Sequence, residues 1–138
     1  MILADTGFFI ALANRQDRFY QSAQQQLNLL KEPLVTTYPV IIETSYLLYE
    51  RSGQTAQFRF LQQLTTDSIQ IFDFQKHHLE RAIQLMQQYA DLPMDLADAS
   101  LVVTAEALQE NRILTTDIRD FSIYRYLNNL AFTLLLIQ

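Results

Sequence analysis

Four acidic residues from separate parts of the chain could form one metal-binding site. Asp5 and Asp117 each follow directly a short apolar run of the kind that forms a β-strand. Glu43 and Asp98 each lie near the start of an apolar helical stretch. Four carboxylates brought together without a basic residue would repel one another strongly, and burial would increase the repulsion. A bound divalent cation would resolve this conflict, and ligation by oxygen atoms alone suits Mg²⁺ or Mn²⁺.

Each acid also has an ordinary structural explanation. Asp5, Asp95 and Asp117 could each cap the helix that follows, by accepting a hydrogen bond from its first turn. Asp98 could be a first-turn acid favoured by the helix dipole, and Glu43 could lie at a solvated edge. Asp95 precedes Asp98 by three residues, a spacing at which like charges repel unless a cation lies between them or one is a cap. The site is therefore inferred from the convergence of separate regions.

Hydroxyl groups lie next to two of the acids in the sequence. Thr6 follows Asp5 directly, and Thr115 and Thr116 precede Asp117. Such hydroxyls could orient carboxylates or water molecules around a cation. Alternatively, they could be helix caps or ordinary strand residues.

Short apolar runs and longer stretches with helical spacing predict how these residues are positioned. Five strands are expected at 1–4, 33–37, 69–72, 112–116 and 132–137. Seven helices are expected at 6–14, 20–30, 39–51, 56–64, 76–89, 96–110 and 118–127. Alternating strands and helices predict an α/β protein with a parallel sheet covered on both sides. In such a sheet, ligands bind outside the carboxyl ends of the strands, which is where the acids are expected.

Length and composition indicate one globular domain spanning residues 1–138. The chain has 49% hydrophobic and 18% charged residues, which excludes disorder. There is no cysteine, so disulfides, thiolate metal sites and cysteine nucleophiles are excluded. The only glycines, Gly7 and Gly53, are too few for phosphate-binding loops of the Walker or dinucleotide type.

The formal net charge of −5 looks unsuited to a protein that handles nucleic acid. Without the four acids of the predicted site, however, the charge would be about −1, so the acidity belongs mostly to that site. Four arginines follow the first and fourth predicted strands and could contact phosphates or lie on a solvated surface. They are Arg15, Arg18, Arg119 and Arg125.

The sequence favours a cytoplasmic protein. No basic segment precedes Asp5, so we expect no signal peptide. The apolar stretch from Leu130 to Ile137 is far shorter than the roughly 20 residues of a membrane helix, so we expect no membrane contact.

Other kinds of chemistry fit the residues less well. His77 and His78 are adjacent at a predicted helix start, where surface or capping roles are expected, and no serine lies in a nucleophile-elbow pattern. A phosphoacceptor receiver domain would need an acid such as Asp73 and a late lysine, but the last lysine is Lys76. A catalytically silent domain whose acids bind a basic partner remains an alternative.

Four segments together resemble the PIN-domain family, and within it the VapC-like toxin ribonucleases of toxin–antitoxin pairs. The segments are Leu-Ala-Asp-Thr-Gly-Phe-Phe at 3–9, Val-Ile-Ile-Glu-Thr at 40–44, Leu-Ala-Asp-Ala-Ser-Leu-Val at 96–102 and Leu-Thr-Thr-Asp-Ile-Arg-Asp-Phe at 114–121. The resemblance implies a three-layer α/β/α sandwich with a mostly parallel sheet of about five strands. It also implies hydrolysis of RNA phosphodiester bonds that depends on Mg²⁺ or Mn²⁺.

Carried over residue by residue, the resemblance assigns roles to the acids. The catalytic and metal-binding acids are Asp5, Glu43, Asp98 and Asp117. Asp95 and Asp120 are further candidate ligands, and Asp120 precedes Phe121 as in many relatives, where it is structural. A bound cation would lower the pKa of a water molecule that attacks the phosphorus, and Glu43 would bind a second cation or position that water.

The resemblance also implies partners: an RNA substrate, a small antitoxin with a basic or apolar docking segment, and a second copy of the chain. Segments 8–20 and 38–49 hold more large apolar residues than a small monomer easily buries. We expect part of these segments to form an antitoxin groove and part a homodimer contact, with core packing as the alternative. A non-toxin PIN nuclease of RNA processing or decay is the alternative function.

Overall fold

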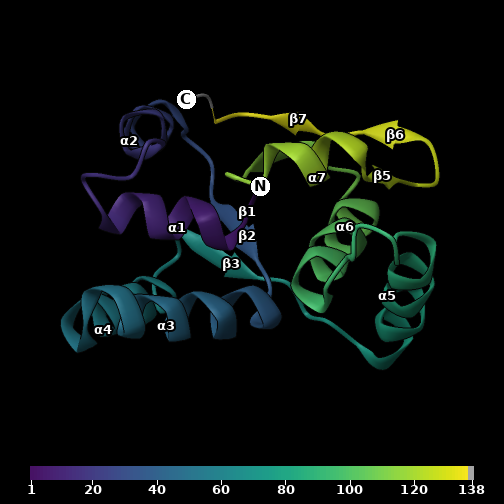
Figure 1. Ribbon diagram of the computed structural model, residues 1–138, viewed down its shortest axis with the longest axis horizontal. Helices are drawn as coiled ribbons and strands as arrows, with labels where there is room; N and C mark the ends of the chain where they lie inside the picture. The colour runs from purple at the N-terminus through teal and green to yellow at the C-terminus, as the bar shows by residue number, and fades with distance from the viewer. Residues whose placement is uncertain (137–138) are drawn as a thin grey trace.

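The computed structural model describes residues 1–136, which form a parallel sheet flanked by helices (Figure 1). The strands are β1 (Ile2–Ala4), β2 (Leu34–Thr36), β3 (Ile69–Ile71), β4 (Arg112–Leu114), β5 (Arg125–Tyr126), β6 (Leu130–Ala131) and β7 (Thr133–Leu134). The helices are α1 (Thr6–Ala13), α2 (Tyr20–Leu29), α3 (Tyr38–Ser52), α4 (Gln54–Gln63), α5 (Lys76–Gln88), α6 (Leu96–Leu108) and α7 (Ile118–Ile123). The predicted α/β class is confirmed.

The order of the strands explains where a site can form. The main sheet has the order β3-β2-β1-β4-β7, and every pair in it is parallel. The chain builds outward from β1 to β3 and then returns to place β4 on the other side of β1. The strand order therefore reverses between β1 and β4, and a crevice outside their carboxyl ends is the usual ligand site of such a sheet. Asp5 follows β1, and Asp117 lies shortly after β4.

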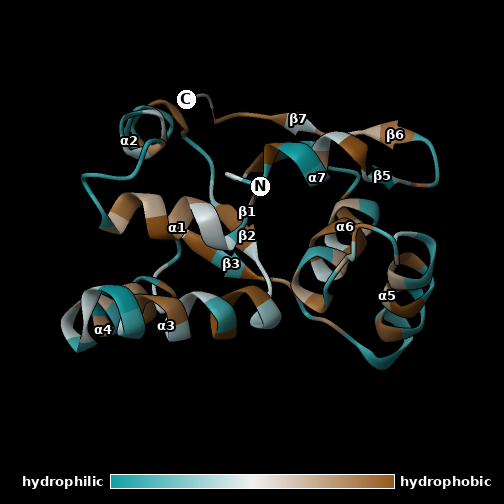
Figure 2. Ribbon diagram, in the orientation of Figure 1, coloured by the Kyte–Doolittle hydropathy of each residue, from teal (hydrophilic) through white to brown (hydrophobic). Residues whose placement is uncertain are grey.

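Burial on both faces explains the apolar character of the central strands. All residues of β1 and β2 are buried, as expected for strands covered on both sides. In Figure 1, helices α1 to α4 lie towards one side of the strands and α5 to α7 towards the other. Figure 2 shows that β1 is hydrophobic, whereas α4 and α5 also carry many hydrophilic residues. Helix α6 is buried along most of its length, which fits its apolar sequence.

Most predicted helices and strands are present, but the C-terminal part differs. The predicted helix at 118–127 is wrong beyond Ile123, where α7 ends. Strands β5 and β6 follow as an antiparallel pair, and the turn between them contains Leu127 and Asn128 with φ angles of 47° and 69°. A right-handed helix excludes such positive φ values. The strand predicted at 132–137 corresponds to β7, and its last predicted residue, Ile137, lies outside the described residues.

Within residues 1–136, no helix combines the length and the apolar character needed to cross a membrane.

Candidate metal centre

Asp5 is held rigidly at the end of β1. Its backbone N–H donates to the carbonyl oxygen of Leu114 at 3.0 Å, which continues the pairing with β4. Its carboxylate caps α1 by accepting from the Thr6 N–H at 2.7 Å, and it accepts from Thr115 Oγ1 at 2.8 Å. The residue is only 6% exposed. Burial raises the pKa of Asp5 to about 6 despite these hydrogen bonds, and the negative charge of Glu43 adds to the effect.

Asp117 begins the short helix that carries a second acid. Its carboxylate caps α7 by accepting from the Asp120 N–H at 3.1 Å. One carboxylate oxygen from each of Asp98, Asp117 and Asp120 lies within 4.8 Å of the other two. Burial is the main cause that raises the pKa of Asp117, and the charge of Asp120 contributes. This three-acid group (Asp98, Asp117 and Asp120) brings together the first turns of α6 and α7.

Asp98 lies in the first turn of α6, which its neighbour Asp95 caps. The Asp98 N–H donates to Asp95 Oδ1 at 2.9 Å. On the other side, the hydroxyl of Tyr124 donates to Asp98 Oδ2 at 2.9 Å. Burial raises the pKa of Asp98 to about 8, and the charges of Asp5 and Asp95 add to this, whereas the tyrosine hydrogen bond opposes it.

Glu43 lies outside the three-acid group. It is half-buried in the second turn of α3, and its charge acts on Asp5. The structure thus places Asp5, Asp98 and Asp117 near one another at the switch point of the sheet, and Glu43 is close enough for its negative charge to raise the pKa of Asp5. Asp120 joins the group, whereas Asp95 is exposed and serves as the helix cap.

The donor set fits a hard divalent cation. Within the described part of the chain, no lysine or arginine makes a hydrogen bond to Asp5, Asp98 or Asp117. Among residues 1–136, Oδ1 of Asp120 is buried without a hydrogen-bond partner, and Nε of Arg119 lies 3.9 Å from it. A buried carboxylate oxygen without a donor is costly, and clustered acids repel, so a cation would satisfy both needs. Carboxylate oxygens are the ligands of Mg²⁺ and Mn²⁺.

The hydroxyl groups next to the acids have different surroundings. Thr115 Oγ1 donates to Asp5 and accepts from the Asp117 N–H at 3.0 Å, so it joins two of the acids. The hydroxyl of Thr6 is buried and has no hydrogen-bond partner in residues 1–136. Thr116 instead packs against α1, where a Cβ atom on Gly7 would overlap its side chain. The first turn of α1 can therefore approach β4 only because residue 7 is glycine.

The four arginines lie in different environments. Nη1 of Arg125 donates to the carbonyl oxygens of Ser122, Ile123 and Tyr124, so it caps the end of α7. Arg119 is exposed beside Asp120. Arg15 lines a cavity beside α1, and Arg18 lines a small hollow that also includes Thr116.

Sequence reasoning missed Tyr124. It lay inside a predicted helix and carried no acid, histidine or hydroxyl motif that would have suggested a role. His77 and His78 contribute nothing to the acidic cluster: His78 Nδ1 accepts from the Gln75 N–H at the start of α5, which is the capping role that was predicted.

The fold and these contacts define an α/β protein with clustered acids at the switch point of a parallel sheet. The profile of the PIN domain matches residues 2–125, so the chain belongs to the PIN-domain family. Ribonuclease VapC26 from Mycobacterium tuberculosis is 25% identical over 134 residues, which cover 97% of this chain and 99% of that protein.

Two solved structures share this fold. The Mycobacterium tuberculosis toxin VapC20, described as cleaving the sarcin–ricin loop, superposes with a TM-score of 0.79 at 19% identity, covering 85% of this chain and 90% of that one. A toxin–antitoxin complex from Klebsiella pneumoniae has a TM-score of 0.66 at 22% identity, covering 88% of this chain and 91% of that one.

Proposed function

We propose that this chain is a metal-dependent endoribonuclease that hydrolyses RNA phosphodiester bonds, and that it is the toxin of a toxin–antitoxin pair. The observation that carries the proposal is the convergence of Asp5, Asp98 and Asp117, to which no basic side chain of residues 1–136 donates a hydrogen bond. Membership of the PIN-domain family and similarity to a VapC ribonuclease support the reaction class. Similarity to a toxin–antitoxin complex supports the biological role.

The acids divide the work according to their surroundings. Asp98 and Asp117 present oxygens to a shared point and would hold Mg²⁺ or Mn²⁺, with Asp5 beside them and Asp120 adding a ligand or a structural contact. When bound, the cation lowers the pKa of a water molecule and stabilises negative charge on the phosphate. Glu43, on the α3 side, would position that water or contribute to a second cation site.

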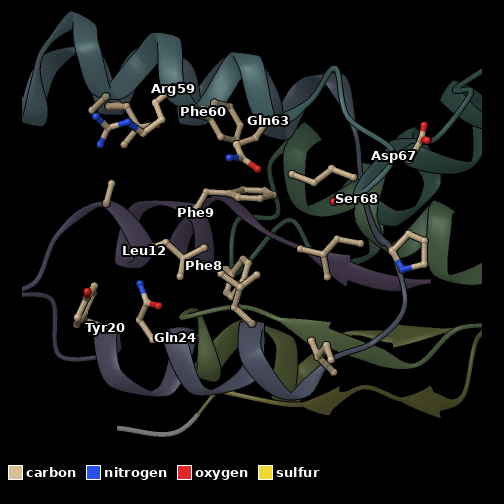
Figure 3. A pocket seen from close by; sticks show the side chains of 18 of the residues that line it. Phe8, Phe9, Leu12, Tyr20, Gln24, Arg59, Phe60, Gln63, Asp67 and Ser68 are labelled. Carbon is tan, nitrogen blue, oxygen red and sulfur yellow. The ribbon is translucent and has the colours of Figure 1, made fainter.

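We place the antitoxin in a cavity away from the acids. This cavity has a volume of about 900 Å³ and lies between α1, α2 and α4 (Figure 3). Figure 3 shows Phe9 and Leu12 of α1 between Phe60 of α4 and Gln24 of α2. Its lining is apolar for the most part, and Leu27, which contributes to it, is 46% exposed, so the cavity suits the apolar face of a helix. None of the clustered acids lines this cavity, so an antitoxin helix docked there would not itself cover the acidic site, and another part of the antitoxin could contact the acids.

We assign the homodimer contact to one face of α3. Four large side chains share this face at helical spacing and are all more than half exposed. They are Tyr38, Ile42, Tyr46 and Tyr49, with exposed fractions of 59%, 68%, 61% and 52%. Together they present about 500 Å² of surface, more than half of the roughly 800 Å² that one partner of a standard interface contributes.

Cleavage of a panel of structured and unstructured RNAs in Mn²⁺, Mg²⁺ or EDTA tests the nuclease. The key variant is Asp98→Asn, because asparagine keeps the shape and can still accept the tyrosine hydrogen bond. Asp91→Asn, which alters an exposed acid in the loop before α6, is the matched control. We expect cleavage by wild type and Asp91→Asn only with metal, and none by folded Asp98→Asn. Equal cleavage by wild type and Asp98→Asn would reject the proposal.

A further inference from the structure

A single tyrosine connects α7 to the acid on α6. The Tyr124 hydroxyl donates to Asp98 Oδ2 at 2.9 Å, and no other hydrogen bond within residues 1–136 joins α6 to segment 117–124. We propose that Tyr124 is a positioning residue of the acidic site, whose hydroxyl holds the Asp98 carboxylate in one orientation, so that this carboxylate binds a cation through one oxygen in preference to both. The proposal rests on the metal-dependent function proposed above.

The ring of Tyr124 is fixed by its surroundings. The residue is completely buried. Its ring meets Phe121 edge-on, with centroids 5.0 Å apart and an angle of 83°, and meets Tyr89 with centroids 5.1 Å apart and an angle of 65°. Such edge-to-face contacts favour one orientation of the ring. The hydroxyl is therefore delivered to one place.

The backbone at Tyr124 is held from two directions. Its N–H donates to the Asp120 carbonyl at 2.9 Å, which closes the last turn of α7. The next N–H, of Arg125, donates to the hydroxyl of Tyr89 at 3.0 Å, and the Arg125 guanidinium caps the free carbonyls of α7. Tyr89 thus supports Tyr124 through both its ring and its hydroxyl.

The position of Tyr124 directly after α7 explains why its hydrogen bond to Asp98 matters for the acidic site. Helix α7 carries Asp117 at its cap and Asp120 in its first turn, while Tyr124 follows its last residue. The start of α7 therefore contributes two acids to the three-acid group (Asp98, Asp117 and Asp120), and Tyr124, at its other end, makes a hydrogen bond to the third. Positions of carboxylates within such groups are commonly fixed by hydrogen bonds from residues that do not themselves bind the metal.

The orientation of the Asp98 carboxylate affects which cation the site prefers. Mg²⁺ requires near-octahedral geometry with few carboxylates, whereas Ca²⁺ accepts more oxygens and often binds carboxylates through both. A carboxylate held in an orientation that offers one oxygen therefore favours the smaller cation. Without the tyrosine hydroxyl, the Asp98 carboxylate could turn and bind Ca²⁺ through both oxygens.

Calorimetric titration of the full chain with Mn²⁺ and, separately, Ca²⁺ at constant pH tests this inference. The variant is Tyr124→Phe, which keeps the ring contacts and removes only the hydroxyl. The control is Tyr126→Phe, because Tyr126 is also buried and packs on Phe132, but its hydroxyl makes no hydrogen bond within residues 1–136. We expect Tyr124→Phe to bind Mn²⁺ about 10-fold more weakly. The ratio of Mn²⁺ affinity to Ca²⁺ affinity should be smaller in Tyr124→Phe than in wild type. Tyr126→Phe should match wild type in its Mn²⁺ affinity and in this ratio.

The outcomes separate the two proposals. If wild type binds Mn²⁺ and Tyr124→Phe binds it equally well, or loses both ions in the same proportion, Tyr124 is not a positioning residue. If wild type binds neither ion, the proposed metal site itself is wrong. A crystal structure of wild type with Mn²⁺ requires no variant to fold. Retention of the Tyr124 bond with Asp98 ligating through its other oxygen supports the inference, and ligation through both oxygens overturns it.

Discussion

The hydroxyl of Thr115 donates to Asp5 Oδ2 at 2.8 Å, across the boundary between β1 and β4. Thr115 Oγ1 also accepts a hydrogen bond from the Asp117 N–H, so the Thr115 side chain aligns the two acids that follow these neighbouring strands. Both strands are hydrogen-bonded to each other up to this point, since the Asp5 N–H donates to the Leu114 carbonyl. The geometry of the site is therefore a direct continuation of the sheet.

We expect Thr115→Val to weaken both the fold and the binding of metal. Valine keeps the shape but leaves Asp5 Oδ2 and the Asp117 N–H without the hydrogen bonds that Thr115 makes, which costs about 1–3 kcal/mol of stability. Binding of Mn²⁺ should weaken about 10-fold, as for other residues that support metal ligands. Thr104→Val is the matched control, because Thr104 is equally buried and its hydroxyl donates only to the Ser100 carbonyl within α6. Equal effects of both variants on Mn²⁺ binding, measured by calorimetry, would contradict this role.

Gly7→Ala should destabilise the protein and disturb the acids together. The added Cβ would overlap the side chain of Thr116, so α1 must move away from the end of β4. Asp5 caps that helix and would move with it. Gly53→Ala is informative by comparison, because a Cβ there meets no atom of residues 1–136 within 4 Å, and the cost, about 1–3 kcal/mol, comes only from the backbone conformation, with φ 89° and ψ 177°. Thermal unfolding should rank Gly7→Ala well below Gly53→Ala, and a second change, Thr116→Ala, should partly restore it.

The metal-free protein should lose stability as the pH rises from about 4 to 8. The pKa of Asp5 is raised to about 6 and that of Asp98 to about 8, both above their usual 3.8, so in this range the folded state retains protons that the unfolded state has lost. For Asp5 alone, about two pKa units correspond to about 3 kcal/mol. Glu32, with a pKa lowered to about 2 by Arg112, affects stability only below about pH 4.5. Thermal unfolding in EDTA measures the slope, and a flat profile would contradict the burial of these acids.

Asp98→Asn should show separately how charge repulsion among the acids and metal binding affect the stability of the fold. Without metal at pH 8, the variant lacks a buried charge next to Asp5, so it should unfold at a higher temperature than wild type. Mn²⁺ should then stabilise wild type at pH 8 and leave the variant unchanged, because a ligand that binds only the folded state raises its stability. If the variant is less stable than wild type in EDTA, Asp98 is a structural residue.

How much of this could be predicted from the sequence depends on how local each feature is. Asp5 and Asp117 could be predicted because each follows a short apolar run, and the parallel sheet because strands and helices alternate along the chain. Helix capping and clustering proved compatible, since Asp5 and Asp117 each cap a helix and lie in the acidic site. The hairpin after α7 was missed because a turn through Leu127 and Asn128 has no glycine or proline to mark it. Tyr124 was missed because its contact with Asp98 spans 26 residues and depends on that unpredicted end of α7.

The exposed face of α3 leads to a prediction about assembly. Tyr46 lies in the middle of this face and is 61% exposed, so Tyr46→Lys would place a charge at the centre of the proposed contact. Phe58→Lys changes a side chain on α4 that is 50% exposed and outside this face, and it serves as the control. Analytical ultracentrifugation should give a dimer for wild type and Phe58→Lys, and a monomer for Tyr46→Lys. Since neither residue lies in the acidic cluster, a dimer that persists in Tyr46→Lys would place the contact on another surface and leave the assignment of the catalytic acids untouched.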